Sequence, residues 1–314
     1  NLGTPRRTRD RRTDVSDDKP TVGFIGLGLM GQGATKCLIR AGYTVTGFDI
    51  DLAKNDLANQ HGVTPVQNAK EVAIASDVVL VCVMTPADLE SAIFADSGAI
   101  HGLKRDAVLV DHSTTPVDVT KEMAARLKHA CGVGWIDAPV SGGPEGAEAG
   151  ELAIMAGGAY ADVAKAQGVL ETLASKFTVF GDVGAGQVAK MVNQVLVLNN
   201  YAIIAEALAL AEAGGIDAAK VPEALASGHA GSNLLPLLFP RMIERDFEPR
   251  GRARQILKDY DTLHDLAKTL KTPTPMSAQA TSLFRMLIAK GGGELDGTAV
   301  LKLFEQGSID EQHG

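Results

Sequence analysis

The sequence predicts an α/β fold in which a doubly wound, mostly parallel sheet comes first and an all-helical part comes second. Between residues 21 and 182, short β-prone runs alternate with helix-compatible segments, as in strands joined by crossover helices. The runs are continuously apolar, as expected when helices cover both faces of a sheet. From residue 183 to residue 314 only helical patterns remain. We therefore expect two domains, preceded by a disordered leader over residues 1–20.

The strand candidates are the apolar runs of the first part. They are Val22–Ile25, Thr44–Phe48, Val78–Met84, Val108–Asp111, Trp135–Asp137, Ala153–Ala156 and Phe177–Phe180. One long helical pattern, Gly186–Ala213, comes after them and is expected to join the two domains. Ligand sites favour domain interfaces and the carboxyl ends of strands, which points to the start of this helix. The later helix candidates are Asp217–Ser227, Leu234–Arg245, Arg252–Leu270, Pro275–Lys290 and Gly297–Gln306.

A glycine-rich turn follows the first strand candidate. Gly26 permits a tight turn, Gly28 permits a pyrophosphate to approach the backbone, and Gly31 permits close packing of helix on strand. Asp49 ends the second strand candidate, where a carboxylate binds the ribose hydroxyls of the adenosine. A purely structural glycine turn is the alternative, which the surrounding strand, helix and acid disfavour. The pattern predicts a Rossmann-type dinucleotide site made of Gly26, Leu27, Gly28, Leu29, Met30, Gly31 and Asp49.

The composition excludes several classes of partner. The chain has 314 residues, is 45% apolar and carries a net charge of −8, which gives no support for binding to nucleic acid. No uninterrupted apolar stretch reaches the length of a membrane span. The three cysteines, at positions 37, 82 and 131, have no CxxC spacing and are expected to be free thiols of a reducing cytoplasm. We therefore expect a cytoplasmic protein without a metal site.

Two polar residues interrupt the long helix near its start. Lys190 and Asn193 are spaced i, i+3 and therefore lie on one helix face. A lysine is almost never fully buried without a partner, and partial desolvation lowers its pKa toward the range of a general acid. Lys190 is thus a candidate proton donor, with Asn193 as its orienting partner. The alternative is a lysine that reaches solvent from the edge of an apolar helix.

A second cluster comes after the strand candidate that ends at Asp137. Ser141, Gly142 and Gly143 expose backbone N–H groups and one hydroxyl, which together form a suitable cradle for a carboxylate. Taken alone, the same residues are also compatible with a flexible loop.

Four motifs stand in a specific order over about residues 20 to 305. They are Ile25-Gly26-Leu27-Gly28-x-Met30-Gly31, Asp137-Ala138-Pro139-Val140-Ser141-Gly142-Gly143, Gly184-Ala185-Gly186-x-x-x-Lys190-x-x-Asn193-Gln194, and Lys258-Asp259. In this order they resemble the β-hydroxyacid dehydrogenase family, which includes 3-hydroxyisobutyrate dehydrogenases and tartronate semialdehyde reductases. The resemblance implies a Rossmann-type domain, an interdomain helix and an all-α C-terminal domain. It also implies hydride transfer between NAD and a small 3-hydroxy acid or its semialdehyde.

The resemblance also implies roles for individual residues. Lys190 would be the catalytic acid/base, and Asn193 would hold the substrate. The substrate carboxylate would be bound by Ser141, Gly142 and Gly143. The remaining matches are Thr114 near nicotinamide and substrate, a cofactor turn at Met84, Thr85 and Pro86, and Lys258 at the cofactor site.

Two departures from the family pattern bear on the substrate. Gln194 follows Asn193 where many members carry a second asparagine, and this Asn-Gln variant resembles tartronate semialdehyde reductases. Gly251 stands where an aromatic residue commonly lines the pocket. Arg252 and Arg254 flank this position and are two apart on a predicted helix, so that at most one is expected to enter the pocket. Solvated surface arginines are the alternative. The spacing of His101, His112, His129 and His229 is not that of metal ligands, and we expect these histidines on the surface or in loops.

Three rival interpretations are compatible with a dinucleotide site. A 6-phosphogluconate dehydrogenase usually has a histidine where Val192 stands and a much longer C-terminal domain. An imine reductase usually lacks the lysine at position 190, and a non-catalytic dinucleotide-binding module would have lost it. The carboxylate of Asp49 would repel a 2′-phosphate, which favours NAD over NADP. Finally, the elongated helical part is expected to be buried in a homodimer or homotetramer.

Overall fold

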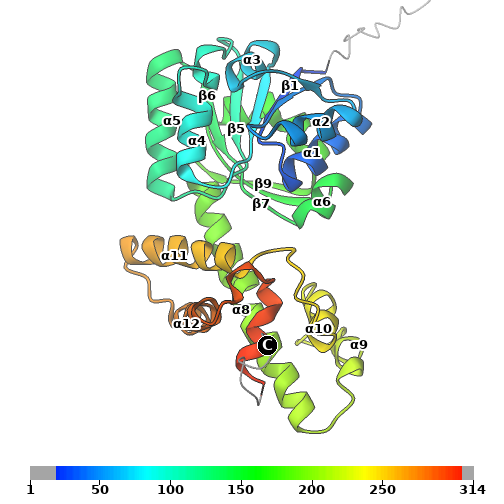
Figure 1. Ribbon diagram of the computed structural model, residues 1–314. Coiled ribbons are helices and arrows are strands. Elements are labelled where there is room, and N and C mark those ends of the chain that lie inside the picture. Colours follow the sequence, from blue (N-terminus) through cyan, green and yellow to red (C-terminus); the bar gives the residue numbers. More distant parts are fainter. Residues whose placement is uncertain (1–18, 306–314) are drawn as a thin grey trace, which may run out of the picture.

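The computed structural model describes residues 19–305, and these form a sheet-containing part and a helical part joined by one long helix (Figure 1). Most of the predicted leader, residues 1–18, lies outside the described residues. At the start of the described chain, the Lys19 ammonium bonds to the Ala41 carbonyl and lies 4.8 Å from the centre of the Tyr43 ring. Residues 19 and 20 therefore belong with the sheet-containing part rather than with the leader.

The sheet has nine strands in the order β3-β2-β1-β4-β5-β6-β8-β7, and β9 pairs with β8. All pairs are parallel except β6–β8 and β7–β8. The strands are β1 (Val22–Ile25), β2 (Val45–Phe48), β3 (Thr64–Pro65), β4 (Val78–Val81), β5 (Val108–Asp111), β6 (Gly134–Asp137), β7 (Val140–Ser141), β8 (Leu152–Gly157) and β9 (Ala174–Gly181). This confirms the predicted Rossmann-type sheet. The strand predicted to reach Met84 ends earlier, because the Val83 amide bonds to the Ser113 hydroxyl and not to a strand.

Helices cover both faces of this sheet, which explains the unbroken apolar strands. One buried cluster lies under α1, α6 and α7 and takes Val78 and Leu80 from β4. The other lies under α3, α4 and α5 and takes Val79 and Val81 from the same strand. The helices of this part are α1 (Leu29–Arg40), α2 (Leu52–Gln60), α3 (Ala69–Ala75), α4 (Pro86–Phe94), α5 (Val117–Cys131), α6 (Gly143–Ala149) and α7 (Tyr160–Leu173), with a 3₁₀ turn at Ala99–His101.

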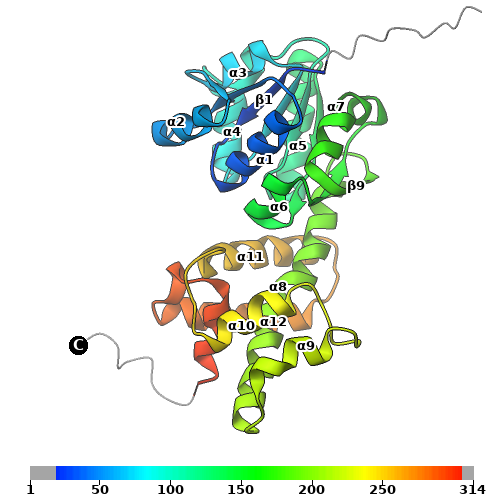
Figure 2. The ribbon, with the colours of Figure 1, turned by 90° about the vertical axis from the view of Figure 1, so that its right-hand side faces the viewer.

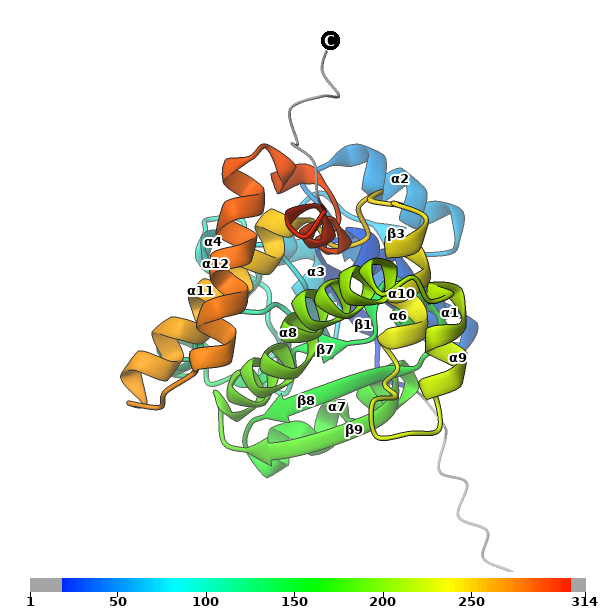
Figure 3. The same cartoon turned by 90° about the horizontal axis from the view of Figure 1, so that it is seen from below.

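The long helix α8 (Ala185–Ala213) leaves the sheet and forms the axis of the helical part (Figures 1 and 3). Around its C-terminal half pack α10 (Leu235–Ile243), α11 (Ala253–Thr269) and α12 (Pro275–Ala289), which share a buried core with it. The chain also forms α9 (Val221–Leu225) and 3₁₀ turns at Ala218–Lys220, Gly292–Glu294 and Gly297–Leu303. In residues 182–305 there is no strand, only an isolated bridge between Arg252 and Asp296. The predicted helix that begins at Gly297 is therefore a 3₁₀ helix over Gly297–Leu303, and the predicted helix Asp217–Ser227 is divided into a 3₁₀ turn and the short α9.

The first turn of α8 is fastened to the carboxyl end of β6 by one carboxylate. Asp137 Oδ1 accepts a hydrogen bond from the Gly184 amide at 2.7 Å, and Oδ2 accepts one from the Gln187 amide at 2.8 Å. Gly186 lies between them, where a methyl group would be 2.5 Å from the carbonyl oxygens of Asp137 and Met155. The free N–H groups of the helix end are thereby satisfied by a buried acid, as helix termini require.

Among the described residues, α8 is also the one helix that is long and apolar enough to cross a membrane. Its first turn is bonded to the sheet, and Leu198, Ile204 and Leu208 lie in the core of the helical part. These contacts are those of a central packing helix.

Replacing Gly186 with alanine tests this attachment. We expect the free energy of unfolding to fall by about 1–3 kcal/mol, because backbone carbonyls cannot rotate away from the added methyl group. Urea denaturation followed by circular dichroism measures the change. The matched control is Gly251→Ala, whose added methyl would meet no atom of the described residues within 4 Å. Equal stability of the two variants would contradict the close approach of α8 to the sheet.

Candidate active site

The glycine turn between β1 and α1 leaves a helix N-terminus open. Gly26 has φ +93°, and a side chain there would collide with the Cys82 carbonyl. Gly31 packs against the Gly26 carbonyl in the same way. At Gly28, the N-cap of α1, an added methyl would meet no described atom within 4 Å, and no side chain of the described residues caps the helix. Such a space beside free N–H groups fits the pyrophosphate of a dinucleotide.

Asp49 ties the end of β2 to this turn and is nearly buried. Its Oδ2 accepts from the Leu27 amide at 2.8 Å, and its Oδ1 accepts from the Asp51 amide at 2.9 Å. Lys54, on α2, places its ammonium 3.4 Å from Asp49 Oδ1 and 3.7 Å from an Asp51 oxygen. The sequence reasoning missed Lys54, although a lysine five residues after the acid was a visible signal.

The turns after β4 and β5 are joined to each other and to α8. Ser113 Oγ accepts from the Val83 amide at 3.0 Å, one residue before the exposed Met84. Fully buried Gln187 donates to the Ser113 carbonyl at 2.8 Å and accepts from the Thr115 amide at 3.3 Å. Gln187 therefore holds both neighbours of Thr114. The sequence reasoning missed it, although it lies one turn before Lys190 on the same helix face.

In the first of these turns, Thr85 begins α4 with a capping box that it forms with Asp88, and Pro86 occupies the first turn of the helix. Thr85, Pro86 and Met84 therefore form a defined turn at the carboxyl edge of the sheet, beside β1.

Lys190 contacts the chain directly before the Ser-Gly-Gly segment, at the carbonyl oxygen of Val140. Lys190 is 8% exposed, and its Nζ donates to the Val140 carbonyl at 2.8 Å, next to Ser141. Gly142 and Gly143 come next with φ +135° and +68°, values that favour glycine. Burial lowers the pKa of Lys190, the nearby Asp259 opposes this, and Lys258 adds to it. The lysine is thus a desolvated cation held against the predicted carboxylate cradle.

A chain of side chains continues from α8 to α11. Asn193 Nδ2 donates to Gln194 Oε1 at 2.9 Å, and Gln194 Nε2 donates to Asp259 Oδ2 at 2.6 Å. Lys258 Nζ lies 3.3 Å from the other carboxylate oxygen of Asp259. The Lys258-Asp259 motif is therefore brought to the Lys190 motif through Gln194, the residue that departs from the common family pattern.

Two buried acids lie side by side at the carboxyl edge of the sheet. Asp111 and Asp137 are register partners on β5 and β6. Burial, with a smaller contribution from the negative charge of Asp137, raises the pKa of Asp111 to about 7, and burial raises that of Asp137 to about 6. Burial and the adjacent Asp111 likewise raise the pKa of Cys82 to about 12. Cys82 is therefore a thiol and not a nucleophile.

His112 lies in the loop after β5, which is one of the two expected kinds of position, but it is not on the surface. His112 is 6% exposed, its Nδ1 lies 2.6 Å from the Ala138 carbonyl, and its Nε2 has no partner among residues 19–305. Burial lowers its pKa, which disfavours the charged imidazole. His101, His129 and His229 are exposed as predicted.

Helical spacing does not keep the two arginines apart, contrary to the argument made from the sequence. Arg252 and Arg254 both pair with Glu294, at 3.3 and 2.6 Å. Arg252 is the N-cap of α11 and has an extended backbone, so that helical spacing does not separate the two side chains. Each is about half exposed, which supports the alternative of surface arginines.

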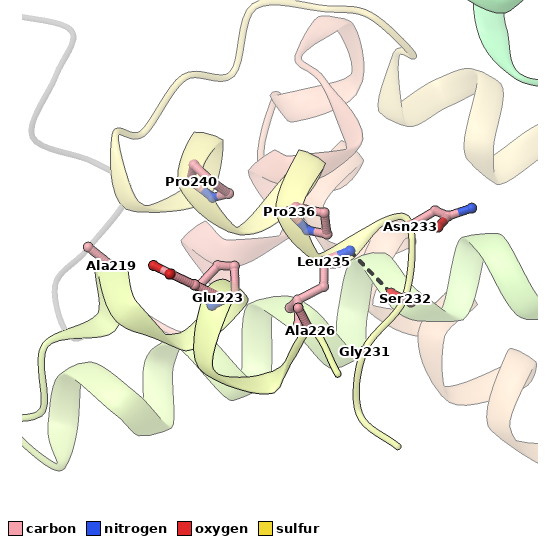
Figure 4. A pocket seen from close by; sticks show the side chains of 10 residues that line it. Ala219, Glu223, Ala226, Gly231, Ser232, Asn233, Leu235, Pro236 and Pro240 are labelled. Carbon is pink, nitrogen blue, oxygen red and sulfur yellow. Dashed lines mark hydrogen bonds between the residues drawn. The ribbon is translucent and has the colours of Figure 1, made fainter. Parts of the chain in front are cut away.

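The site holds no metal cluster among the described residues, and the hollow in the helical part is separate from it. Residues 19–305 contain no group of three histidine, cysteine or acidic side chains that could hold a metal ion. A hollow of about 620 Å³ lies between α9 and α10 and is lined by Pro222, Glu223, Asn233 and Pro236 among others (Figure 4). None of its lining residues belongs to the predicted site.

Known proteins resemble the chain along nearly its whole length. A family model described as the NAD binding domain of 6-phosphogluconate dehydrogenase matches residues 21–181, and one described as NAD-binding of NADP-dependent 3-hydroxyisobutyrate dehydrogenase matches residues 184–304. The 2-hydroxy-3-oxopropionate reductase of Escherichia coli is 34% identical over 284 residues, 90% of this chain and 97% of that protein. This chain belongs to the β-hydroxyacid dehydrogenase family.

Two other members of the β-hydroxyacid dehydrogenase family illustrate its range. The 2-(hydroxymethyl)glutarate dehydrogenase of Eubacterium barkeri is 33% identical over 286 residues, 91% of this chain and 95% of that protein. The crystal structure of 3-hydroxyisobutyrate dehydrogenase from Salmonella typhimurium has a TM-score of 0.83 at 30% identity and covers 90% of this chain and 99% of that one. The chain is therefore an oxidoreductase of hydroxy acids that uses a nicotinamide dinucleotide. Family membership therefore favours a hydroxyacid dehydrogenase over the three rival interpretations.

Proposed function

We propose that this β-hydroxyacid dehydrogenase oxidises a small 3-hydroxy acid to its semialdehyde, or runs the reverse reaction, with Lys190 as the general acid/base. The observation that carries the proposal is the buried Lys190 ammonium, which contacts the Val140 carbonyl beside Ser141. Desolvation lowers its pKa toward neutrality, where one side chain can both accept and return a proton.

Each predicted site residue then has a task. Lys190 Nζ takes the hydroxyl proton during oxidation and returns it during reduction. Asn193 orients the lysine and the substrate hydroxyl, and Thr114, fixed on both sides by Gln187, borders the substrate. The substrate carboxylate is bound by the Ser141 hydroxyl and by the backbone of Gly142 and Gly143.

The cofactor is bound along the carboxyl edge of the sheet. The α1 N-terminus at Gly26, Leu27, Gly28, Leu29, Met30 and Gly31 would hold the pyrophosphate, and Asp49 the adenosine ribose. The turn at Met84, Thr85 and Pro86, together with Thr114 and Lys258, would border the nicotinamide end. When bound, the nicotinamide accepts the hydride in oxidation and supplies it in reduction.

We also propose NAD as the preferred cofactor. The nearly buried Asp49 carboxylate is fixed at the ribose position by the Leu27 and Asp51 amides, and it would repel a 2′-phosphate. Lys54 opposes this preference in part, because its charge lies within 4 Å of both acids.

The substrate proposal is a small 3-hydroxy acid with a polar substituent. Arg252 and Arg254 both pair with Glu294. They therefore give no reason to expect a second anionic group on the substrate. The names of the relatives favour the acids related to 2-hydroxy-3-oxopropionate, 3-hydroxyisobutyrate and 2-(hydroxymethyl)glutarate. Threonate remains a fourth candidate.

A second copy of the chain is the proposed partner. Val192, Leu196, Ile203 and Leu210 on α8 are each more than half exposed, and the last three are spaced by seven residues along one helix face. A homodimer or homotetramer would bury this stripe. The division at residues 182 and 183 and a cytoplasmic location likewise remain proposals, the latter because Cys37, Cys82 and Cys131 are free thiols.

Lys190→Ala tests the mechanism. With glycerate, 3-hydroxyisobutyrate, threonate and 2-(hydroxymethyl)glutarate as substrates, kcat on the best acid should fall by about 10²–10⁴, the usual contribution of a positioned general acid/base. Absorbance of reduced nicotinamide measures the rate, and dinucleotide affinity should hardly change. Lys268→Ala, an exposed lysine of α11, is the control. Near-normal turnover of Lys190→Ala would refute the assignment, and no activity on any acid would refute the substrate class.

Asp49→Ala tests the cofactor preference. For the unaltered chain, kcat/KM with NAD should exceed that with NADP by at least about tenfold, which corresponds to about 1.4 kcal/mol. The variant should lower this ratio without abolishing catalysis, although release of the Leu27 amide should weaken binding of both cofactors. Asp51→Ala, which removes the cap of α2, is the comparison. Comparable efficiency with both cofactors in the unaltered chain would contradict the proposal.

Ile203→Glu tests the oligomer. Light scattering coupled to gel filtration should give a dimer or tetramer for the unaltered chain and a smaller species for the variant, because a charge would interrupt the apolar stripe. Ile74→Glu is the matched control, since Ile74 is 53% and Ile203 54% exposed. A stable monomer of the unaltered chain at micromolar concentration would rule the oligomer out.

A further inference from the structure

Asp259 lies on α11, which belongs to the helical part of the chain. Figure 2 shows α11 running beneath the sheet-containing part, across the path of α8. Asp259 is mostly buried and has two partners, the Gln194 amide at 2.6 Å and the Lys258 ammonium at 3.3 Å. Its place in a sequence motif does not by itself say what the carboxylate does.

The hydrogen bonds that begin at Asp259 have only one possible direction. An ionised carboxylate accepts hydrogen bonds and cannot donate them. Gln194 must therefore turn its NH₂ group toward Asp259, which directs its carbonyl oxygen to the other side. Asn193 meets that oxygen and must in turn present its own NH₂ group, at 2.9 Å.

At the end of this series of hydrogen bonds, the Oδ1 atom of Asn193 is still to be accounted for. With its NH₂ group committed to Gln194, Asn193 offers its Oδ1, an acceptor, to its remaining surroundings. An acceptor is what can orient the ammonium of Lys190, one turn earlier on the same face of α8, or the hydroxyl of a substrate. If either amide were reversed, a donor would stand there instead and would repel the ammonium.

We propose that Asp259 is a positioning residue that acts at a distance: through Gln194 it sets the orientation of the Asn193 amide. Its negative charge has a second effect, because it favours the protonated form of Lys190, one turn before Gln194 on α8. This rests on the proposed role of Lys190. Asp259 touches neither substrate nor cofactor in this scheme. Its two effects are separable, because Gln194 carries the first and the carboxylate charge carries the second.

The charges around Lys190 support the second effect. On α11, Asp259 raises the pKa of Lys190 and Lys258 lowers it. On β7, Lys190 meets the uncharged Val140 carbonyl. On β6, the carboxylate of Asp137 is committed to the amides at the start of α8. Loss of the Asp259 charge thus removes the attraction that favours the protonated lysine in spite of its burial.

Two variants separate the effects. Asp259→Asn can donate as well as accept, so that both amides lose their fixed direction. We expect kcat for oxidation to fall about tenfold to hundredfold, as for a mispositioned catalytic group, and the rise of kcat with pH to move to lower pH. Gln194→Leu removes the relay and keeps the charge, so that kcat should fall by a similar factor while the pH of the rise stays unchanged. In the double variant the losses of kcat should not add, because both act on the orientation of Asn193.

Asp261→Asn is the control, because it lies on the same helix and its carboxylate pairs with Arg285 at the surface. It should leave kcat and the pH profile as they are. Melting temperatures establish that each variant is folded. If Asp259→Asn does not fold, Gln194→Leu still decides the relay: unchanged kcat overturns it. Folded Asp259→Asn with an unshifted pH profile overturns the effect of the charge. A fully active Lys190→Ala would refute the proposed function itself, which is a different outcome.

Discussion

The carboxylate of Asp137 is the point on which the arrangement of this molecule depends. It lies at the end of β6, accepts from the amides of Gly184 and Gln187, and so begins the helix that carries the candidate acid/base. Helix geometry then determines where the next polar side chains lie. Gln187 reaches the turn after β5, and Lys190, one turn later, reaches Val140 on β7. A single buried acid thereby positions one helix against the ends of β5 and β6 and against β7.

Within one helical turn, α8 passes from contacts with the sheet-containing part to contacts with the helical part. Lys190 is bonded to the sheet-containing part, whereas Gln194 is bonded to Asp259 of the helical part. The candidate site is therefore built where α8 passes between them, and both parts must be in place before its polar groups are oriented. Burial has opposite effects on the two kinds of group: it lowers the pKa of Lys190 and raises the pKa values of Asp111 and Asp137 at the sheet edge.

The features predictable from the sequence were those that a short segment imposes on itself. Gly26 needs its left-handed backbone whatever lies around it, and the apolar strands and long α8 result from local periodicity. The rest depended on distant neighbours. His112 is buried because Ala138 from the next strand faces it, and Arg252 and Arg254 are drawn to Glu294, about forty residues later. The two-residue strands β3 and β7 are too short to leave a pattern.

The position of Lys190 has a consequence for how such chains can be recombined. The two family models meet between residues 181 and 184, so that a crossover placed there exchanges the two parts at their apparent boundary. Such a crossover would deliver a lysine from one parent to the Asp137 anchor and Val140 carbonyl of another. A crossover between residues 190 and 193 instead keeps Lys190 with its anchor and gives Gln194 to the parent that supplies Asp259. The segment that must be exchanged together with the sheet-containing part therefore extends about two turns into α8.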